Sequence, residues 1–317
     1  MAKPIYGGWV TFTSHLALKY EAQLYKIGKR TEPNQRDYGY GVKYRNLRID
    51  DFLKLDNILI TAVDKHYWKY LDLFPNGTKV VIHDPTELKG KENKLRELLD
   101  NFEVITIRES VKNFLLENFK KESTFLPHPF FEYKKDGVGE KCDYYSLCIS
   151  RIDFDKNINL ILHANKLLDE TKKIYLFGAE NRLYVHHKLK DMEFEKYWMG
   201  KYPKNLPMKY ENKDLLDNCA FVVDMSIIVG DGGGTQYTFL EAIYHNCALI
   251  LHKDWVEKGK TFKNGYNCFV VGYTDNIGEE ISSIINNGVN VEYKKIVKNA
   301  SKLLKIHTKD LWKDIFS

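Results

Sequence analysis

The chain has 317 residues and a mass of 37.2 kDa, and 44% of its residues are hydrophobic, 14% aromatic and 29% charged. This length predicts two domains, and this composition excludes disordered, collagen-like and coiled-coil proteins. The formal net charge is +5, yet residues 1–50 hold nine Lys and Arg against four Asp and Glu, so the remaining residues are balanced. We therefore expect a mild, local attraction for anions near the N-terminus.

Neither a membrane span nor a secretory signal is predicted. No apolar run approaches about 18 residues, and residues 1–20 lack the basic flank, unbroken apolar stretch and cleavage site of a signal peptide. The five cysteines include no CxxC pair that would indicate zinc or redox chemistry. We expect a cytoplasmic protein, in the host cytoplasm if it is viral, with reduced cysteines and no stable membrane insertion.

The first half of the chain alternates short β-branched runs with stretches of helical period, which is typical of parallel sheets flanked by helices. The pattern predicts a Rossmann-like domain over residues 1–135. Its strands are expected at 3–6, 58–63, 79–83, 104–108 and 124–126, and its helices at 66–74, 86–101 and 110–119.

A polar, aperiodic stretch at 131–141 is the predicted linker, and a second alternation follows it. Strands are expected at 144–150, 173–177, 220–225, 248–252 and 267–271, and helices at 157–169, 213–218 and 236–245. This pattern predicts a second Rossmann-like domain at 143–300 and a C-terminal helix at 301–317 that packs back on the first domain. The predicted fold class is α/β, with two doubly wound domains facing across a cleft and ligands beyond the carboxyl ends of the strands.

A glycine run at 230–234 separates a predicted strand from a predicted helix. Gly232, Gly233 and Gly234 would let backbone N–H groups approach a ligand closely, and the helix start at Thr235 and Gln236 adds a positive dipole end, which suits a phosphate. The run is neither a Walker A loop nor a dinucleotide fingerprint. The alternative is a flexible turn without a ligand.

Glu241 shares a helical face with Tyr237 and Thr238 by three- and four-residue spacing. A carboxylate above a phosphate-binding helix start is well placed to accept both hydroxyls of a ribose. The alternative is a solvated helical glutamate.

Arg151 and Lys156 lie in the stretch SRIDFDKN, between a strand and a helix. A guanidinium fork and an ammonium group at a strand end could together neutralise a diphosphate without a metal ion. The alternative is that both side chains are simply solvated.

Two short motifs follow strands of the first domain. Gly7-Gly8 follows the first strand, and His83-Asp84-Pro85 follows a later one. His83 could donate a hydrogen bond to a sugar hydroxyl, and Asp84 could lie near a cationic reaction centre or polarise an attacking hydroxyl. The alternative for Asp84 is a helix cap. No metal motif and no GxSxG elbow is present, so hydrolase and deaminase chemistry is disfavoured.

In chain order these pieces resemble the retaining GT-B glycosyltransferases of family 4, over nearly the whole chain. The matching segments are Gly7-Gly8, SRIDFDKN at 150–157, NKDLLDNCAFVVDMS at 212–226 and TQYTFLEAIYHNCALIL at 235–251. The resemblance implies a nucleotide-sugar donor, UDP-linked by expectation, with no obligatory cofactor or metal. It implies that Arg151 and Lys156 hold the donor diphosphate, that Glu241 binds the ribose, and that Gly8 and residues 232–238 also contact the donor.

One position departs from the family pattern. The first of two glutamates separated by seven residues is Gly233 here, so its contact with the donor sugar must be absent or supplied otherwise. The same departure, with a TFLE-like helix and a His-Asp pair, is similar to the T-even phage DNA α-glucosyltransferases, which glycosylate hydroxymethylcytosine.

Residues 34–48 interleave basic and aromatic side chains, and from them we expect an acceptor contact through Tyr38, Tyr40, Lys43 and Arg45. Cations attract phosphates and aromatic faces stack on bases, as an enzyme that flips a base out of double-stranded DNA requires. Aromatic faces also stack on sugars. The sequence thus predicts a retaining sugar transfer to a hydroxyl, with hydroxymethylated DNA as the favoured acceptor. The alternatives are a polysaccharide or lipid-linked acceptor, a nucleotide-sugar epimerase, and a DNA-binding module without catalysis.

Overall fold

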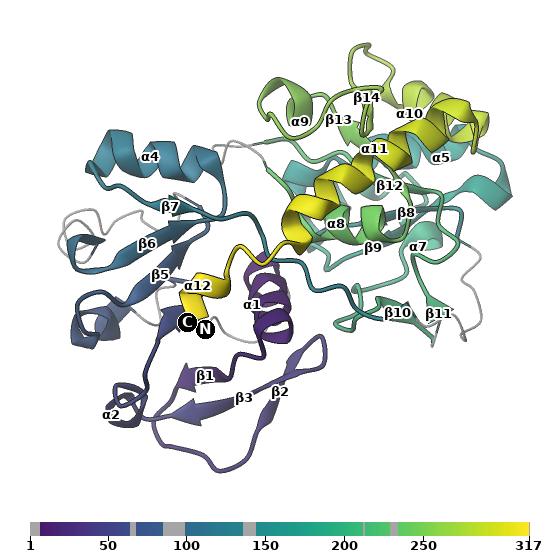
Figure 1. Ribbon diagram of the computed structural model, residues 1–317. Helices are drawn as coiled ribbons and strands as arrows, with labels where there is room; N and C mark the ends of the chain where they lie inside the picture. Colours follow the sequence, from purple (N-terminus) through teal and green to yellow (C-terminus); the bar gives the residue numbers. More distant parts are fainter. Residues whose placement is uncertain are drawn as a thin grey trace. The chain divides into compact units, whose positions relative to one another are not determined.

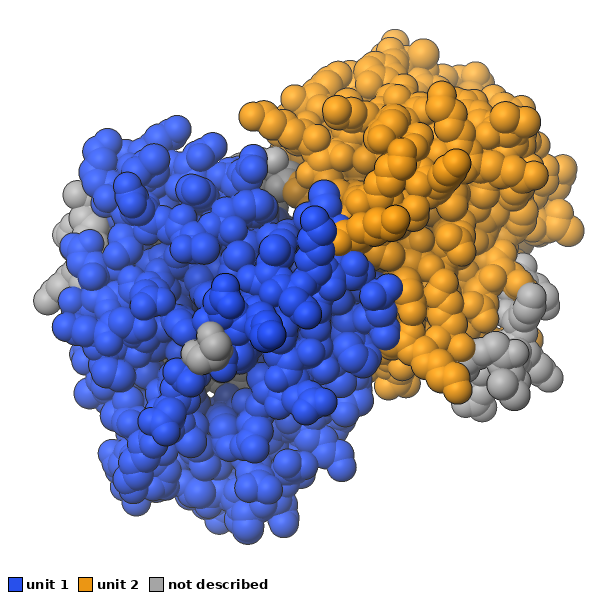
Figure 2. Space-filling model, viewed as in Figure 1, with its two compact units in different colours: residues 1–132, 230–232, 306–317 blue, residues 133–229, 233–305 orange. Residues whose placement is uncertain are grey.

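The computed structural model describes residues 7–63, 68–84, 99–135, 144–211, 213–228 and 234–316. The chain divides into two compact units, coloured separately in Figure 2. Unit 1 comprises residues 1–132, 230–232 and 306–317, and unit 2 comprises residues 133–229 and 233–305. Among the described residues, no helix is both long and apolar enough to cross a membrane. Cys148, Cys219, Cys247 and Cys268 are free and buried.

Unit 1 contains a four-stranded parallel sheet in the order β4-β5-β6-β7 (Figure 1). Its strands are β4 (Leu59–Ile60), β5 (Lys79–Ile82), β6 (Glu103–Thr106) and β7 (Thr124–Phe125). The two central strands, β5 and β6, are mostly buried. The accompanying helices are α1 (Gly8–Tyr20) and α4 (Glu109–Phe119), and the helix predicted at 66–74 is a 3-10 helix at Trp68–Leu73. The strand predicted at 3–6 and most of the helix predicted at 86–101 lie outside the described residues.

A second, three-stranded sheet in unit 1 was not predicted. It consists of β1 (Leu24–Ile27), β2 (Arg36–Gly39) and β3 (Val42–Leu47), in the order β1-β3-β2, and is followed by the short helix α2 (Ile49–Phe52). Tyr40 and Gly41 join β2 to β3, both with positive φ, as in a type I′ hairpin turn. Along β3 exposed and buried side chains alternate. This alternation decides which side chains of residues 34–48 reach solvent.

Unit 2 is built on a five-stranded parallel sheet in the order β14-β13-β12-β8-β9. Its strands are β8 (Ser146–Ile149), β9 (Ile174–Phe177), β12 (Phe221–Asp224), β13 (Ala248–His252) and β14 (Phe269–Val271). After β9 the chain passes to the other side of β8 to form β12, so the strand order reverses between β8 and β12. Such a switch point is where open α/β sheets bind ligands, outside the carboxyl ends of the strands.

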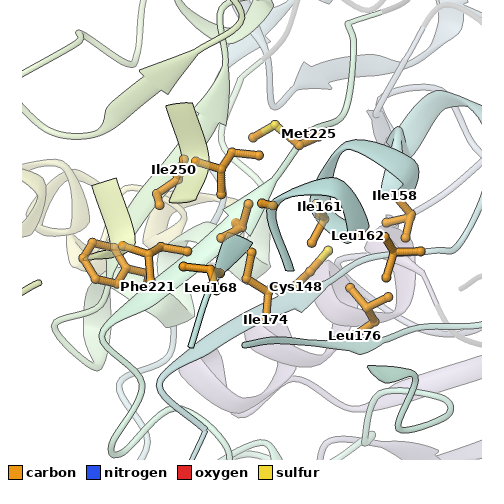
Figure 3. Packing of buried hydrophobic residues seen from close by; sticks show 14 of the residues in the cluster. Cys148, Ile158, Ile161, Leu162, Leu168, Ile174, Leu176, Phe221, Met225 and Ile250 are labelled. Atoms are coloured by element: carbon orange, nitrogen blue, oxygen red, sulfur yellow. The ribbon is translucent and has the colours of Figure 1, made fainter. Parts of the chain in front are cut away.

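The packing of the unit 2 core explains why the predicted bounds of its strands lie close to the observed ones. Helices flank the sheet, among them α5 (Ile158–Leu167), α8 (Tyr237–Tyr244) and α10 (Ile277–Asn287), so strand residues on both faces are buried and apolar. Figure 3 shows Cys148, Ile174, Phe221 and Ile250 from the sheet packing with Ile161 and Leu162 of α5. The remaining helices are two 3-10 helices (Phe154–Lys156 and Glu170–Lys172), α6 (Arg182–Tyr184), a π-helical turn (Val185–Leu189), α7 (Phe194–Tyr197), α9 (Asp254–Glu257) and α11 (Val291–Thr308).

The prediction of a helix at 213–218 is wrong. Lys213–Asp214 forms strand β11, paired antiparallel with β10 (Lys209–Tyr210), and turns follow. The Asp214 carboxylate accepts a hydrogen bond from the backbone N–H of Leu216 at 3.1 Å. Leu215 N–H donates to Met208 O at 2.9 Å. Such local side-chain bonds to the backbone compete with helix formation.

The C-terminal segment, with helix α12 (Lys313–Phe316), belongs to unit 1. Lys19 Nζ donates to the carbonyl oxygens of Thr308 at 2.5 Å and Lys309 at 2.8 Å. Trp312 Nε1 donates to Pro127 O at 2.8 Å, and its ring lies edge-on to Phe12 with 5.4 Å between the ring centroids. Trp312, which is far from Phe12 and Pro127 in the sequence, is thus part of the core of unit 1.

Candidate functional site

The loop after β8 carries Arg151 and Lys156 at the switch point of the unit 2 sheet. Arg151 contacts two carboxylates of its own loop, with Nη1 at 3.0 Å from Asp153 Oδ2 and Nη2 at 3.3 Å from Asp155 Oδ2. Its side chain remains 60% exposed, so these ion pairs contribute little stability and mainly orient the guanidinium group. Arg151 is therefore positioned at the edge of the sheet and accessible to a ligand.

Lys156 lies at the end of the same loop and reaches the neighbouring one. Its Nζ donates to Ser226 Oγ at 3.0 Å, and its side chain is only 13% exposed. Ser226 in turn donates to Asp224 Oδ1 through its hydroxyl and, at 2.8 Å, through its backbone N–H. The bond to Ser226 uses one of the three N–H groups of Lys156. The Oδ2 atom of Asp155 lies 3.4 Å from Lys156 Nζ. The ammonium group is fixed and partly desolvated, which strengthens its attraction for an anion.

Further contacts join the loops at this edge of the sheet. Asn157 Nδ2 donates to Met225 O at 3.0 Å, and Ile227 N–H donates to Asp155 O at 3.1 Å. Trp255 Nε1, in α9 beyond β13, donates to Ser226 O at 3.1 Å. The sequence analysis did not identify Ser226 and Asp224 as site residues. The available signal was Asp224 and Ser226 at the end of the apolar run Phe221–Val223.

The predicted phosphate-binding loop is described only from Gly234 onward, and Gly232 and Gly233 lie outside the described residues. Gly234 has a φ of 142°, a conformation that favours glycine. Gln236 is the N-cap residue of α8, and Thr238 is half-buried in its first turn. Thr235 and Tyr237 are buried. Helix α8 therefore starts at Tyr237, one residue after the predicted start at 236.

Glu241 is fully buried within α8, so the alternative of a solvated helical glutamate is wrong. Burial raises the pKa of Glu241 well above its usual range, and the negative charge of Asp214 raises this pKa further. Glu241 contributes no accessible surface in this conformation. Its contact with a ribose therefore stays a prediction.

At the carboxyl edge of the unit 1 sheet, His83 follows β5 and Thr61 follows β4. His83 Nε2 donates to the backbone oxygen of Thr61 at 2.7 Å, which leaves this proton unavailable to the predicted sugar hydroxyl. Burial lowers the pKa of His83 to about 4, although the bond to Thr61 opposes this shift, so the ring is neutral at neutral pH. Asp84 is half-buried, and the segment behind it lies outside the described residues.

Arg108 lies after β6 and His128 after β7, and neither was predicted as a site residue. The positive charge of Arg108 acts on both His83 and His128. Burial lowers the pKa of His128 well below its usual value, and Arg108 lowers it further. Each of the four parallel strands thus brings a polar residue to one edge of the sheet. Gly8 begins α1, and among the residues that the structure describes no atom lies within 4 Å of where its Cβ would be.

The prediction that tyrosines of residues 34–48 offer stacking faces is wrong. Tyr38, Tyr40 and Tyr44 are 1%, 4% and 6% exposed, because the alternation of the β-hairpin turns them into the core of unit 1. The hydroxyls of Tyr40 and Thr11 are hydrogen-bonded at 2.9 Å. Lys43 and Arg45 are exposed.

A group with metal-ligand geometry that the sequence did not suggest consists of Asp214, Asp217 and His245, whose ligand atoms lie within 4.8 Å of one another. Both imidazole nitrogens of His245 are engaged, Nδ1 with Asp217 Oδ1 at 3.3 Å and Nε2 with Tyr133 OH at 3.1 Å. Burial lowers the pKa of His245 to about 4. These two hydrogen bonds give His245 a structural role, because they join the end of α8 to Asp217 and Tyr133.

No protein-family model matches the chain, and no curated protein is similar to it in sequence. Among solved structures, Anabaena HepE in complex with UDP and glucose has a TM-score of 0.64 at 13% identity, covering 97% of this chain and 95% of HepE. A point mutant of S. aureus TarM, in complex with Fondaparinux, α-GlcNAc-glycerol and UDP, has a TM-score of 0.58 at 15% identity, covering 85% and 58%. The pneumococcal O-GlcNAc transferase GtfA, in complex with UDP and GlcNAc, has a TM-score of 0.53 at 16% identity, covering 84% and 56%.

At these identities the likeness concerns the fold. The chain has the α/β architecture of the GT-B glycosyltransferases, which confirms the fold class predicted from the sequence. The narrower similarity to phage DNA glucosyltransferases receives no support from these neighbours.

Proposed function

We propose that the chain is a glycosyltransferase that moves a sugar from a UDP-sugar to a hydroxyl acceptor, with retention of anomeric configuration. The observation that carries the proposal is the bond between Lys156 Nζ and Ser226 Oγ at the switch point, beside the exposed guanidinium of Arg151. The GT-B fold supports it, because its neighbours HepE and GtfA hold UDP and a sugar. Retention is implied by the family resemblance.

Arg151 and Lys156 would bind the donor diphosphate and stabilise the negative charge that grows as the glycosidic bond breaks. A hydrogen bond from a cation to an anion contributes about 1.5–3 kcal/mol, and such groups accelerate a reaction when the charge they face develops in the transition state. Residues 232–238 would cradle the same phosphates with backbone N–H groups and the positive end of the α8 dipole.

Glu241, Gly8, His83 and Asp84 complete the proposed machinery. Glu241 would accept the ribose hydroxyls after a local movement that uncovers its carboxylate. Gly8 would offer backbone N–H groups to the donor, and His83 and Asp84 would position the transferred sugar. The neutral ring of His83 suits a hydroxyl-rich ligand, because an imidazolium would repel the positive charge that forms at the reacting carbon.

A saccharide acceptor is favoured over hydroxymethylated DNA. Part of the case for DNA depended on stacking faces among residues 34–48, and these tyrosines are buried. The other part was the similarity to phage DNA glucosyltransferases, which the structural neighbours do not support. A nucleotide-sugar epimerase remains the second candidate, because it would use the same diphosphate contacts and release UDP with water, instead of an acceptor hydroxyl, taking the sugar.

The test is to incubate the protein with a panel of nucleotide sugars and with saccharide, hydroxymethylated DNA or no acceptor, and to measure product mass and free UDP. A hexose or pentose added to a saccharide supports the proposal, and NMR of the new linkage reports its anomeric configuration. Free UDP without any glycosylated product would favour the epimerase, and a glycosylated nucleoside would restore the DNA acceptor.

Matched variants test the diphosphate contact. Arg151→Ala and Lys156→Ala should each weaken UDP binding by about tenfold or more. Lys166→Ala removes the same charge from an exposed position near the end of α5 and should leave UDP binding unchanged. Equal UDP affinity in all three variants would overturn the assignment of the diphosphate site.

A further inference from the structure

Unit 1 contains a cavity of about 460 Å³ that the proposed donor chemistry does not use. It is lined by the C-terminal end of α1, the start of β1, and β3. Its polar lining consists of Glu21, Gln23, Tyr25, Gln35, Lys43 and Arg45. This volume is in the range of pockets that bind small molecules or single units of a polymer.

Three basic residues near this pocket are paired with carboxylates. Arg36 contacts Glu32 at 2.8 Å, Arg48 contacts Asp50 at 2.7 Å, and Lys54 contacts Asp51 at 3.0 Å. Within the part of the chain that the structure describes, no carboxylate oxygen lies within 4.0 Å of Lys43 or Arg45. Lys43 and Arg45 are therefore available to attract an anion from solution.

The geometry places both charges on one surface. Lys43 and Arg45 are two residues apart on β3, so both side chains leave the same face of the sheet, with their Cα atoms roughly 7 Å apart. Tyr25 lies opposite Arg45 in the register of β1 and β3. A fork and an ammonium group side by side suit an anion with several oxygens, such as a carboxylate or a phosphate.

The other polar groups suit hydroxyls. The Tyr25 hydroxyl donates to Gln23 Oε1, which leaves the amide N–H groups of Gln23 as donors. Gln35 adds a second amide, with both donor and acceptor atoms. Amides and a phenol ring, together with the carboxylate of Glu21, surround the two cations and supply hydrogen-bonding groups for the hydroxyls of a charged sugar.

The pocket is also separate from the end of α1 that begins at Gly8. It is lined by Ala17, Leu18 and Glu21, which lie roughly 14–20 Å along the helix axis from Gly8. One sugar ring cannot contact both ends. An occupant of the pocket would therefore be a unit of an extended acceptor distant from the reacting hydroxyl.

We infer that this cavity is an anion-binding subsite for a distal, carboxylate- or phosphate-bearing unit of an extended saccharide acceptor. The inference rests on the proposed function and specifies its acceptor class. A saccharide fits better than a nucleic acid, because the site is one concave pocket with two available cations, whereas a phosphate backbone requires an extended row of them.

The experiment measures binding of four probes to the full chain in the presence of UDP. The probes are a galacturonic acid hexamer, a glycerol phosphate hexamer, neutral maltohexaose, and a 12-base-pair hydroxymethylated DNA duplex. The wild type should bind at least one anionic hexamer about tenfold more tightly than maltohexaose. Which anionic hexamer binds distinguishes a carboxylate from a phosphate. K43A/R45A should abolish the preference, whereas R30A/K54A, which removes two paired charges of the same unit, should retain it.

Three results would overturn the inference. They are equal binding of the anionic hexamers and maltohexaose by the wild type, equal losses in the two double variants, and a DNA affinity that depends on Lys43 and Arg45 more strongly than saccharide affinity does. UDP affinity, measured in parallel, should be the same in all three proteins. Failure of the wild type to bind UDP would contradict the proposed function instead, so the two failures are distinguishable.

Discussion

Lys156 Nζ lies 3.0 Å from Ser226 Oγ, and this hydrogen bond joins the loop after β8 to the loop after β12. Ser226 is held by Asp224, the last residue of β12, so the position of the ammonium group depends on a serine that lies 70 residues later in the chain. The cation at the switch point is therefore preorganised by the sheet itself, and the cost of orienting it is met when the protein folds.

Ser226→Ala tests this preorganisation. The substitution removes the acceptor for Lys156 and the donor to Asp224, so we expect a loss of about 1 kcal/mol in the free energy of unfolding and a UDP affinity several-fold weaker. Calorimetric titration with UDP and denaturant unfolding measure the two effects. Ser283→Ala, at an exposed position in α10, is the control. Unchanged UDP affinity in Ser226→Ala would show that the serine does not position the lysine.

Glu241→Gln separates stability from ligand binding. Because the pKa of Glu241 is raised in the folded state, the stability that its protonated form provides is complete below the unfolded value near 4.3 and is lost as pH rises toward the folded pKa. A neutral glutamine of the same shape avoids this loss, so the variant should unfold at a higher temperature than the wild type at pH 8 and at a similar one at pH 4.

The same variant should bind UDP less tightly if Glu241 meets the ribose as a carboxylate. Glu195→Gln, at an exposed position in α7, should change neither the unfolding temperature nor UDP affinity. A Glu241→Gln protein with a higher unfolding temperature and full UDP affinity would assign Glu241 to packing alone.

Acid should destabilise unit 1 through its buried histidines. Burial lowers the pKa of His15 to about 3 and that of His83 to about 4. The unfolded chain therefore binds more protons as pH falls below about 6.5, and the stability present above that value is lost. For His83 alone the loss between pH 7.5 and pH 5 is about 2 kcal/mol.

Hydrogen exchange of each unit at the two pH values measures this effect. His83→Gln retains an amide donor toward Thr61 and should lose less stability in unit 1 on acidification than the wild type. His163→Asn, at an exposed position of α5, should behave like the wild type. Equal acid sensitivity of His83→Gln and the wild type would contradict the assignment.

The sequence predicted those features that depend on local patterns. Strand β13 was predicted at its observed bounds, Ala248–His252, because a strand buried on both faces is a continuous apolar run with polar ends. Arg151 and Lys156 were identified for the same reason, as charges next to such a run. Ser226 could not be paired with Lys156 in this way, because the contact exists only once β12 lies beside β8.

The errors have physical causes as well. The pattern of residues 34–48 suggested a basic aromatic loop, but a hairpin turn at Tyr40 and Gly41 makes the spacing alternate across a sheet, which buries the tyrosines and exposes Lys43 and Arg45. At 213–218, apolar residues at helical spacing were outweighed by the bond from Leu216 N–H to the Asp214 carboxylate. In both segments a local feature of the chain outweighed the spacing of the side chains.

The contacts of Lys19 and Trp312 also bear on the order in which the protein is made. Trp312 packs against Phe12, and Lys19 holds the carbonyls of Thr308 and Lys309. A ribosome releases these C-terminal residues only after it has translated all of unit 2. The N-terminal unit, although its first residues are synthesised first, therefore cannot complete its native core before unit 2 has been synthesised.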